Sequence, residues 1–115
     1  MVDMFGIPNC DTIKKARKWL EENSVEYQFH DYKKEGVDAH LLEEWSEAVG
    51  WERLLNRRGT TWRKLADEAK ESVNETRAIQ LMVENPSMIK RPVLVAGDRI
   101  TVGFSEAEYQ KLFSS

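Results

Sequence analysis

The first 32 residues contain two apolar segments separated by an amphipathic one, and this order restricts the fold more than any other feature of the chain. Residues 1–7 (MVDMFGI) form a short apolar run punctuated by Gly6, which predicts a strand. Residues 12–23 place their apolar side chains on one helical face, and residues 25–32 (VEYQFHDY) alternate as a strand does. Strand, helix and strand in this length predict a βαβ unit, so the two strands should be parallel.

The middle of the chain is helical and charged. Helix signals run over residues 38–50 and 74–86, beginning at the capping residues Asp38 and Asn74. In the second of these helices, a set of apolar residues shares the predicted buried face: Ile79, Met82 and Val83. Between the two helices we expect a short helix, a loop around Gly59 and another turn near Trp62.

The pattern changes again near the end. Residues 91–104 (RPVLVAGDRITVGF) are two apolar runs joined by Gly97–Asp98, which predicts a β-hairpin, and Ser105 should cap a final helix. The order βαβ, helices, ββα resembles the thioredoxin-like arrangement, an α/β fold with a mixed sheet. We therefore expect a single thioredoxin-like domain over residues 1–115, with an inserted helical subdomain at about 33–90.

Composition narrows the class of protein. The net charge is −3 over 115 residues, unlike the strongly basic chains that bind nucleic acid. No leader-like segment and no apolar window of about 18 residues is visible, so we expect a cytoplasmic, soluble monomer with no nucleic-acid and no membrane partner. With one cysteine and two histidines far apart, we expect no metal site.

Cys10 is the only cysteine, and it falls between the first predicted strand and the helix that follows. A helix N-terminus stabilises an anion, and a thiol placed there has a pKa of roughly 3.5–7.5 instead of about 8.5. Lys14 and Lys15 add positive charge one turn further on, while Asn9, Asp11 or Thr12 is expected to cap the helix. We predict a reactive thiolate; the alternative is a small buried hydrophobe.

A second candidate cluster lies in NPSMIKRPVLV (residues 85–95). Pro92 either begins a strand or follows a cis peptide bond beside the thiol. Arg91 is either a solvated surface cation or a residue that binds a carboxylate or oxyanion through two parallel hydrogen bonds. Arg57, in a predicted loop, forms an anion site only if that loop folds over Cys10. We expect the two histidines to be structural or surface residues.

Three segments together, FGIPNCDTIKKARKWLEE, GWERLLNRRGTTWRKL and NPSMIKRPVLV, resemble the arsenate reductase (ArsC)/Spx-like family, in particular its small YffB-type branch. The resemblance implies a thioredoxin-like fold with a helical insertion, a Cys10 nucleophile, Arg91 at the active site and a cis Pro92. Arsenate reductases of this type hold the oxyanion with three arginines, of which Arg91 matches one, while Asn56 and Gly103 stand at the other two positions.

We therefore expect a glutathione-dependent monothiol reductase in which Cys10 forms a mixed disulfide with an oxidised sulfur substrate. Since the chain has no second cysteine, an external thiol must resolve it, with glutathione as co-substrate and no bound cofactor. The residues expected to bind substrate or thiol are Asn9, Asp11, Thr12, Arg57, Arg91 and Pro92.

Three alternatives remain open at this point. One is an arsenate reductase with an incomplete arginine set. Another is a non-catalytic Spx-like protein whose partner is RNA polymerase; Ile13 stands where the second cysteine of a C-x-x-C redox switch would be. The third is a protein in which Cys10 belongs to the core and function lies elsewhere.

Overall fold

The computed structural model describes residues 2–114, with the exception of the side chain of Ala69. The chain forms two compact units. Unit 1 consists of the segment up to Asp31 and the segment from Arg91 onward, and unit 2 is Tyr32–Lys90. We propose that unit 2 is the helical insertion that the sequence predicts for about residues 33–90.

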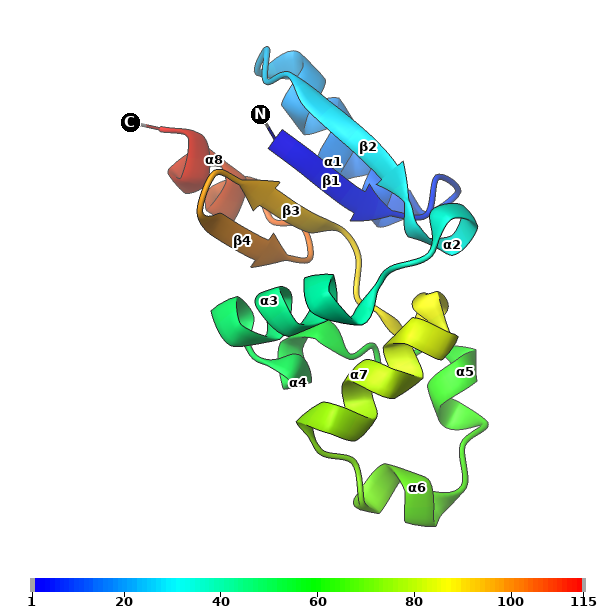
Figure 1. Cartoon of the computed structure of the whole chain (residues 1–115). Coiled ribbons are helices and arrows are strands. Elements are labelled where there is room, and N and C mark those ends of the chain that lie inside the picture. Colours follow the sequence, from blue (N-terminus) through cyan, green and yellow to red (C-terminus); the bar gives the residue numbers. More distant parts are fainter. Residues whose placement is uncertain (1, 115) are drawn as a thin grey trace. The chain divides into compact units, whose positions relative to one another are not determined.

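Unit 1 contains a four-stranded mixed sheet in the order β2-β1-β3-β4 (Figure 1). The strands are β1 (Val2–Gly6), β2 (Tyr27–Asp31), β3 (Val93–Ala96) and β4 (Arg99–Val102). β1 and β2 are parallel, as the predicted βαβ unit requires, and helix α1 (Asp11–Glu22) connects them. β3 pairs antiparallel with both β1 and β4, which completes the predicted α/β architecture.

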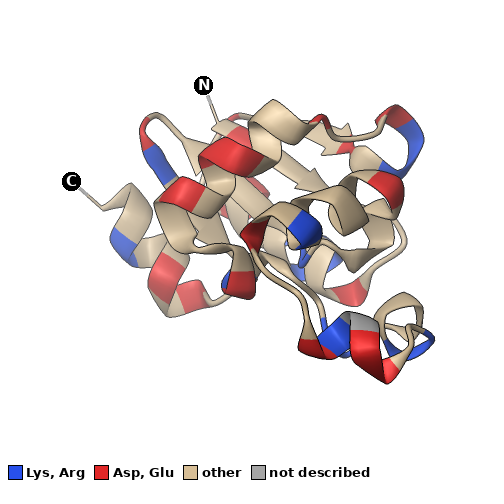
Figure 2. Ribbon diagram, turned by 60° about the horizontal axis from the view of Figure 1, so that its bottom comes forward, with Lys and Arg blue, Asp and Glu red and all other residues tan. Residues whose placement is uncertain are grey.

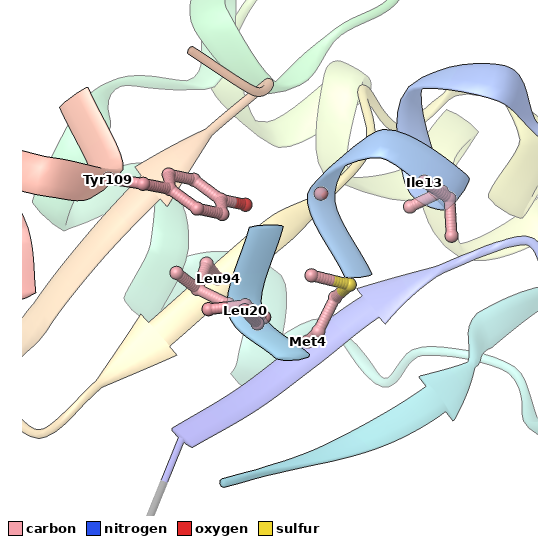
Figure 3. Close-up of a cluster of buried hydrophobic side chains, with 6 residues drawn as sticks. Met4, Ile13, Leu20, Leu94 and Tyr109 are labelled. Carbon is pink, nitrogen blue, oxygen red and sulfur yellow. The ribbon is translucent and has the colours of Figure 1, made fainter. Parts of the chain in front are cut away.

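The core of unit 1 lies between the sheet and helices α1 and α8 (Glu106–Phe113). Six fully buried side chains form it: Met4, Ile13, Ala16, Leu20, Leu94 and Tyr109. Figure 3 shows side chains from β1, α1, β3 and α8 converging there. The three residues from α1 recur at helical spacing, so a single face of that helix covers the sheet. Each large side chain in such a core contributes about 1.5–3 kcal/mol.

Tyr109 is the aromatic centre of this core. Its ring packs edge-on against Trp19, with the centroids 5.6 Å apart, and against Phe104 at 4.9 Å. Burial raises the pKa of its phenol above the usual range, and its hydroxyl has no hydrogen-bond partner in the described part of the chain. Tyr109 therefore holds α8 on the sheet through ring packing instead of through its polar end.

The regular elements of unit 2 are all helices. Its elements are α2 (Tyr32–Glu35), α3 (Ala39–Val49), α4 (Trp51–Leu54), α5 (Thr60–Arg63), α6 (Asp67–Glu71), α7 (Glu75–Glu84) and the 3-10 helix η1 (Pro86–Met88). The predicted caps are confirmed: the Asp38 carboxylate accepts a hydrogen bond from the Leu41 amide, and the Asn74 side chain accepts one from the Arg77 amide, both at 2.9 Å.

Two expectations about local structure were wrong. Val83 is 38% exposed, although its spacing from Ile79 placed it on the buried face of α7. The buried residues of α7 instead form an arc that runs from Leu81 through Ala78 and Met82 to Ile79. Since each residue turns the helix by about 100°, Val83 lies beyond the Ile79 edge of this arc. The second strand begins only at Tyr27, because the chain first leaves α1 through a turn with Ser24 at a φ of 56°.

Within residues 2–114, every helix is too short or too polar to cross a lipid bilayer.

Replacing Leu20 with alanine should lower the free energy of unfolding by about 2–5 kcal/mol, because the side chain is fully buried among α1, the sheet and α8. Lys18→Ala on the exposed side of the same helix should change it by no more than about 0.5 kcal/mol. Urea denaturation followed by circular dichroism measures both values. Similar losses for the two variants would contradict this description of the core.

Candidate active site

Cys10 lies at the junction between β1 and α1. β1 ends at Gly6, a turn follows, and Cys10 is the N-cap of α1, with its carbonyl accepting the first helical hydrogen bond from the Lys14 amide at 3.0 Å. The expectation that Asn9, Asp11 or Thr12 caps the helix was wrong. The helix begins directly after Cys10, so Asp11 and Thr12 are already its first two helical residues.

The Cys10 side chain is partly buried. It packs at the edge of the apolar core of unit 1, yet it retains solvent exposure. A purely structural cysteine is normally enclosed by other side chains. The position therefore leaves the sulfur open to a reaction partner while restricting its movement.

Opposing effects act on the pKa of the Cys10 thiol, and the net result lies below the ordinary value. Burial raises the pKa, whereas the backbone amide of Ile13, the Arg91 side chain and the backbone amide of Thr12 lower it by hydrogen bonding to the sulfur. The Arg91 charge lowers it further. The neutral thiol makes no N-capping hydrogen bond to the helix. The amides and Arg91 therefore stabilise mainly the ionised sulfur, because a thiolate accepts hydrogen bonds more strongly than a thiol does.

Arg91 reaches this site because of how β3 pairs with β1. In their antiparallel register Phe5 is opposite Val93, so the end of β1 lies beside the start of β3. The Arg91–Pro92 peptide bond is cis, which confirms what the family resemblance implied. Pro92 is buried, and its carbonyl accepts a hydrogen bond from the Gly103 amide at 2.9 Å, which anchors the segment to the end of β4.

Gly6 is a residue of the site that the sequence reasoning treated only as punctuation. A methyl group at Gly6 would overlap the Ile13 side chain and would lie 3.8 Å from Cβ of Arg91. The absence of a side chain therefore allows β1, the first turn of α1 and the Arg91 segment to approach one another closely. The only sequence signal for this role was the position of Gly6 at the end of a predicted strand.

The structure thus brings together four of the predicted residues within unit 1: Cys10, Thr12, Arg91 and Pro92. Asn9 and Asp11 are exposed beside them in sequence. Arg57 belongs to unit 2, where its guanidinium lies over the rings of Trp51 and Trp62, and its part in binding substrate at Cys10 stays a prediction.

The two histidines take structural and surface positions. The His30 ring stacks on Phe5, with the centroids 4.6 Å apart, and its Nε2 lies 2.9 Å from an Asp3 carboxylate oxygen. His40 is exposed on α3, 3.7 Å from a Glu43 carboxylate oxygen. Among the described side chains, no group of three or more His, Cys, Asp or Glu residues is arranged to hold a metal ion.

Comparison with known proteins identifies the family of the chain. The ArsC family model matches residues 5–112. The chain belongs to the ArsC family. A solved structure of a protein called YffB is 48% identical, covers 99% of this chain and 100% of its own, and superposes with a TM-score of 0.95.

Two further relatives have names that indicate different functions. An arsenate reductase (ArsC) related protein from Brucella melitensis is 50% identical, with coverage of 99% of this chain and 95% of its own and a TM-score of 0.78. The global transcriptional regulator Spx of Streptococcus agalactiae is 30% identical over 94% of this chain and 80% of its own. The mixed four-stranded sheet and its helices therefore form the fold that this chain shares with the solved YffB structure.

The thiolate absorbance of the wild-type protein should rise with a midpoint below the ordinary thiol value of about 8.5. Arg91→Gln should move this midpoint upward, because it removes both a hydrogen-bond donor and a positive charge from the sulfur. Arg99→Gln, which removes an exposed cation from β4 of the same unit, is the matched control and should leave it in place. A wild-type midpoint at or above 8.5 would contradict the described electrostatics.

The same shift should make stability depend on pH. A pKa lowered on folding adds stability above the unfolded-state pKa, and that stability disappears as the pH falls through the folded-state pKa. The wild type should therefore gain stability relative to Cys10→Ser as the pH rises from the folded-state pKa to about 8.5. Urea denaturation across this range measures the difference, and a constant difference would argue against a stabilised thiolate.

Proposed function

We propose that the protein is a glutathione-dependent monothiol reductase that acts through a mixed disulfide on Cys10. The observation that carries this proposal is the partly exposed Cys10 thiol, whose pKa is lowered by the first amides of α1 and by Arg91. Membership of the ArsC family, which includes proteins described as related to arsenate reductase, supports thiol-dependent reduction as the general chemistry.

In the first step, the Cys10 thiolate attacks one sulfur of a disulfide substrate. The electron pair of the thiolate forms the new S–S bond, the substrate S–S bond breaks, and the departing sulfur takes a proton from solvent. The substrate gains the electrons released as Cys10 is oxidised to the mixed disulfide. The amides of Thr12 and Ile13 hold the sulfur anion in place before the attack.

In the second step, a glutathione thiolate attacks the substrate-derived sulfur. The mixed disulfide breaks and Cys10 departs as a thiolate, which is a good leaving group because its pKa is low. The net reaction converts a disulfide and one glutathione into a free thiol and a glutathione mixed disulfide. An external thiol is required because Cys10 is the only cysteine of the chain.

Arg91 has a second role in this proposal. Its guanidinium can pair with a carboxylate of glutathione in a two-bond fork while still facing the sulfur. Binding the carboxylate at this point would orient the incoming thiol toward the mixed disulfide.

Treatment with glutathione disulfide should add one glutathionyl group to the wild-type protein and none to Cys10→Ser, as measured by intact mass spectrometry. Cys10→Ser should also abolish turnover of a disulfide substrate with glutathione, because it removes the nucleophilic sulfur. The circular dichroism spectrum should be unchanged, because serine is close to cysteine in size. Retained turnover in this variant would end the proposal.

Arg91→Gln should raise KM for glutathione about tenfold, the cost of one charge-assisted hydrogen bond. N-acetylcysteamine, a thiol with no carboxylate, is the control: its KM should not rise, although both thiols should react more slowly because the Cys10 pKa increases. An equal rise in KM for the two thiols would show that Arg91 does not bind the carboxylate.

Two other functions are separated by simple assays. Arsenate reduction is favoured by the Brucella relative, and arsenate-dependent oxidation of glutathione would detect it. An Spx-like role is favoured by the transcriptional regulator relative, and capture of RNA polymerase that is equal for wild type and Cys10→Ser would support a non-catalytic interaction.

A further inference from the structure

A backbone bridge in unit 2 brings together two segments that are far apart in sequence. Leu55 and Ile89 form an isolated antiparallel bridge. On either side of it, the Lys90 amide donates to the Leu54 carbonyl at 2.6 Å and the Asn56 amide donates to the Met88 carbonyl at 2.7 Å. Lys90 is therefore fixed beside the loop that carries two arginines.

This loop, residues 56–59, makes two contacts with the Asn56 side chain. The Arg58 amide donates to the Asn56 side-chain oxygen at 3.1 Å. Gly59 lies so close to the same side chain that an added Cβ would be 3.3 Å from Asn56 Nδ2. The direction in which the loop leaves the bridge is thus determined by Asn56 and Gly59.

Arg57 is positioned by two aromatic rings. Its guanidinium carbon lies 5.9 Å from the centroid of Trp51 and 5.7 Å from that of Trp62. These cation–π contacts restrict the side chain without neutralising it. Arg57 keeps its full charge and its hydrogen-bond donors for another partner.

Arg57 lines a cavity of about 300 Å³, together with Glu52, Leu55, Asn56, Arg58 and Lys90. Three cations and one carboxylate give the lining a net charge of +2. None of the three cations forms an ion pair with any residue of the described chain. Elsewhere acidic and basic positions are interspersed along the ribbon (Figure 2). Even with the Glu52 carboxylate in the lining, three neighbouring cations leave a surplus of positive charge that a bound anion would neutralise.

We propose that this cavity is a binding site for a small dianion, carrying either a phosphate monoester or two carboxylates. Such a ligand matches the excess of two positive charges, and guanidinium groups bind both kinds of oxyanion in a forked geometry. The cavity is larger than a phosphate ion requires, so it leaves room for an organic group attached to the anion. The site lies wholly in unit 2 and does not depend on the reaction proposed for Cys10.

Nuclear magnetic resonance titration of the full chain with inorganic phosphate and with malonate tests this proposal, with sodium chloride at equal ionic strength as the reference. Saturable shifts should appear at the amides of Arg57 and Arg58 and at the indoles of Trp51 and Trp62. A response to phosphate alone or to malonate alone would support the site and identify the anion class. An equal response to chloride, shifts confined to residues 10–13, or no saturation would overturn the proposal.

The variant Arg58→Gln/Lys90→Gln should weaken binding at least tenfold, because each replaced cation removes a charge-assisted contact. Arg53→Gln/Lys64→Gln, which removes two exposed cations of unit 2 that do not line the cavity, is the matched control and should bind as tightly as wild type. Equal weakening by the control would show that only overall charge matters. Cys10→Ser should bind the dianion normally, so this test is independent of the proposed reductase activity.

Discussion

The antiparallel pairing of β1 with β3 is the constraint on which the candidate active site depends. It places the end of the first strand next to the start of the third, and so brings the turn that carries Cys10 beside the cis Arg91–Pro92 segment. A shift of this register by one residue would turn every β3 side chain to the opposite face and remove Leu94 from the core. The packing that stabilises unit 1 and the pairing that assembles the thiol site are therefore the same contacts.

The chemistry of Cys10 results from a balance between burial and polar contacts. Packing against the core restricts the sulfur but penalises its charge, which alone would raise the pKa. The helix amides and the Arg91 guanidinium more than offset this penalty, and the pKa falls. Since the sulfur is only partly buried, solvent screens these interactions, so geometry and access matter as much as the size of the shift.

The names of this chain's relatives indicate more than one function. Relatives of this chain include an arsenate reductase related protein of similar structure and, by sequence, a transcriptional regulator. Function is therefore decided by a few side chains placed on that frame. In this protein Asn56 and Gly103 occur where the family resemblance leads one to expect arginines, and Asn56 lines the same cavity as Arg57, Arg58 and Lys90.

Local signals in the sequence determined most of the elements. Apolar periodicity, the Gly97–Asp98 turn and the caps Asp38, Asn74 and Ser105 predicted strands and helices that the structure contains, because each depends on residues close together in the chain. The same signals placed Cys10 between a strand and a helix. The short helix α6 was missed, since four of its five residues are charged and give little periodic information.

Tertiary structure alone decided which of these elements meet. The contact of Arg91 with the thiol, the close packing permitted by Gly6 and the exposure of Val83 depend on partners distant in sequence. The cation-lined cavity depends in the same way on the bridge between Leu55 and Ile89. Pairing between distant segments is selected by the burial and hydrogen bonding of the whole chain, and no local pattern of residues encodes it.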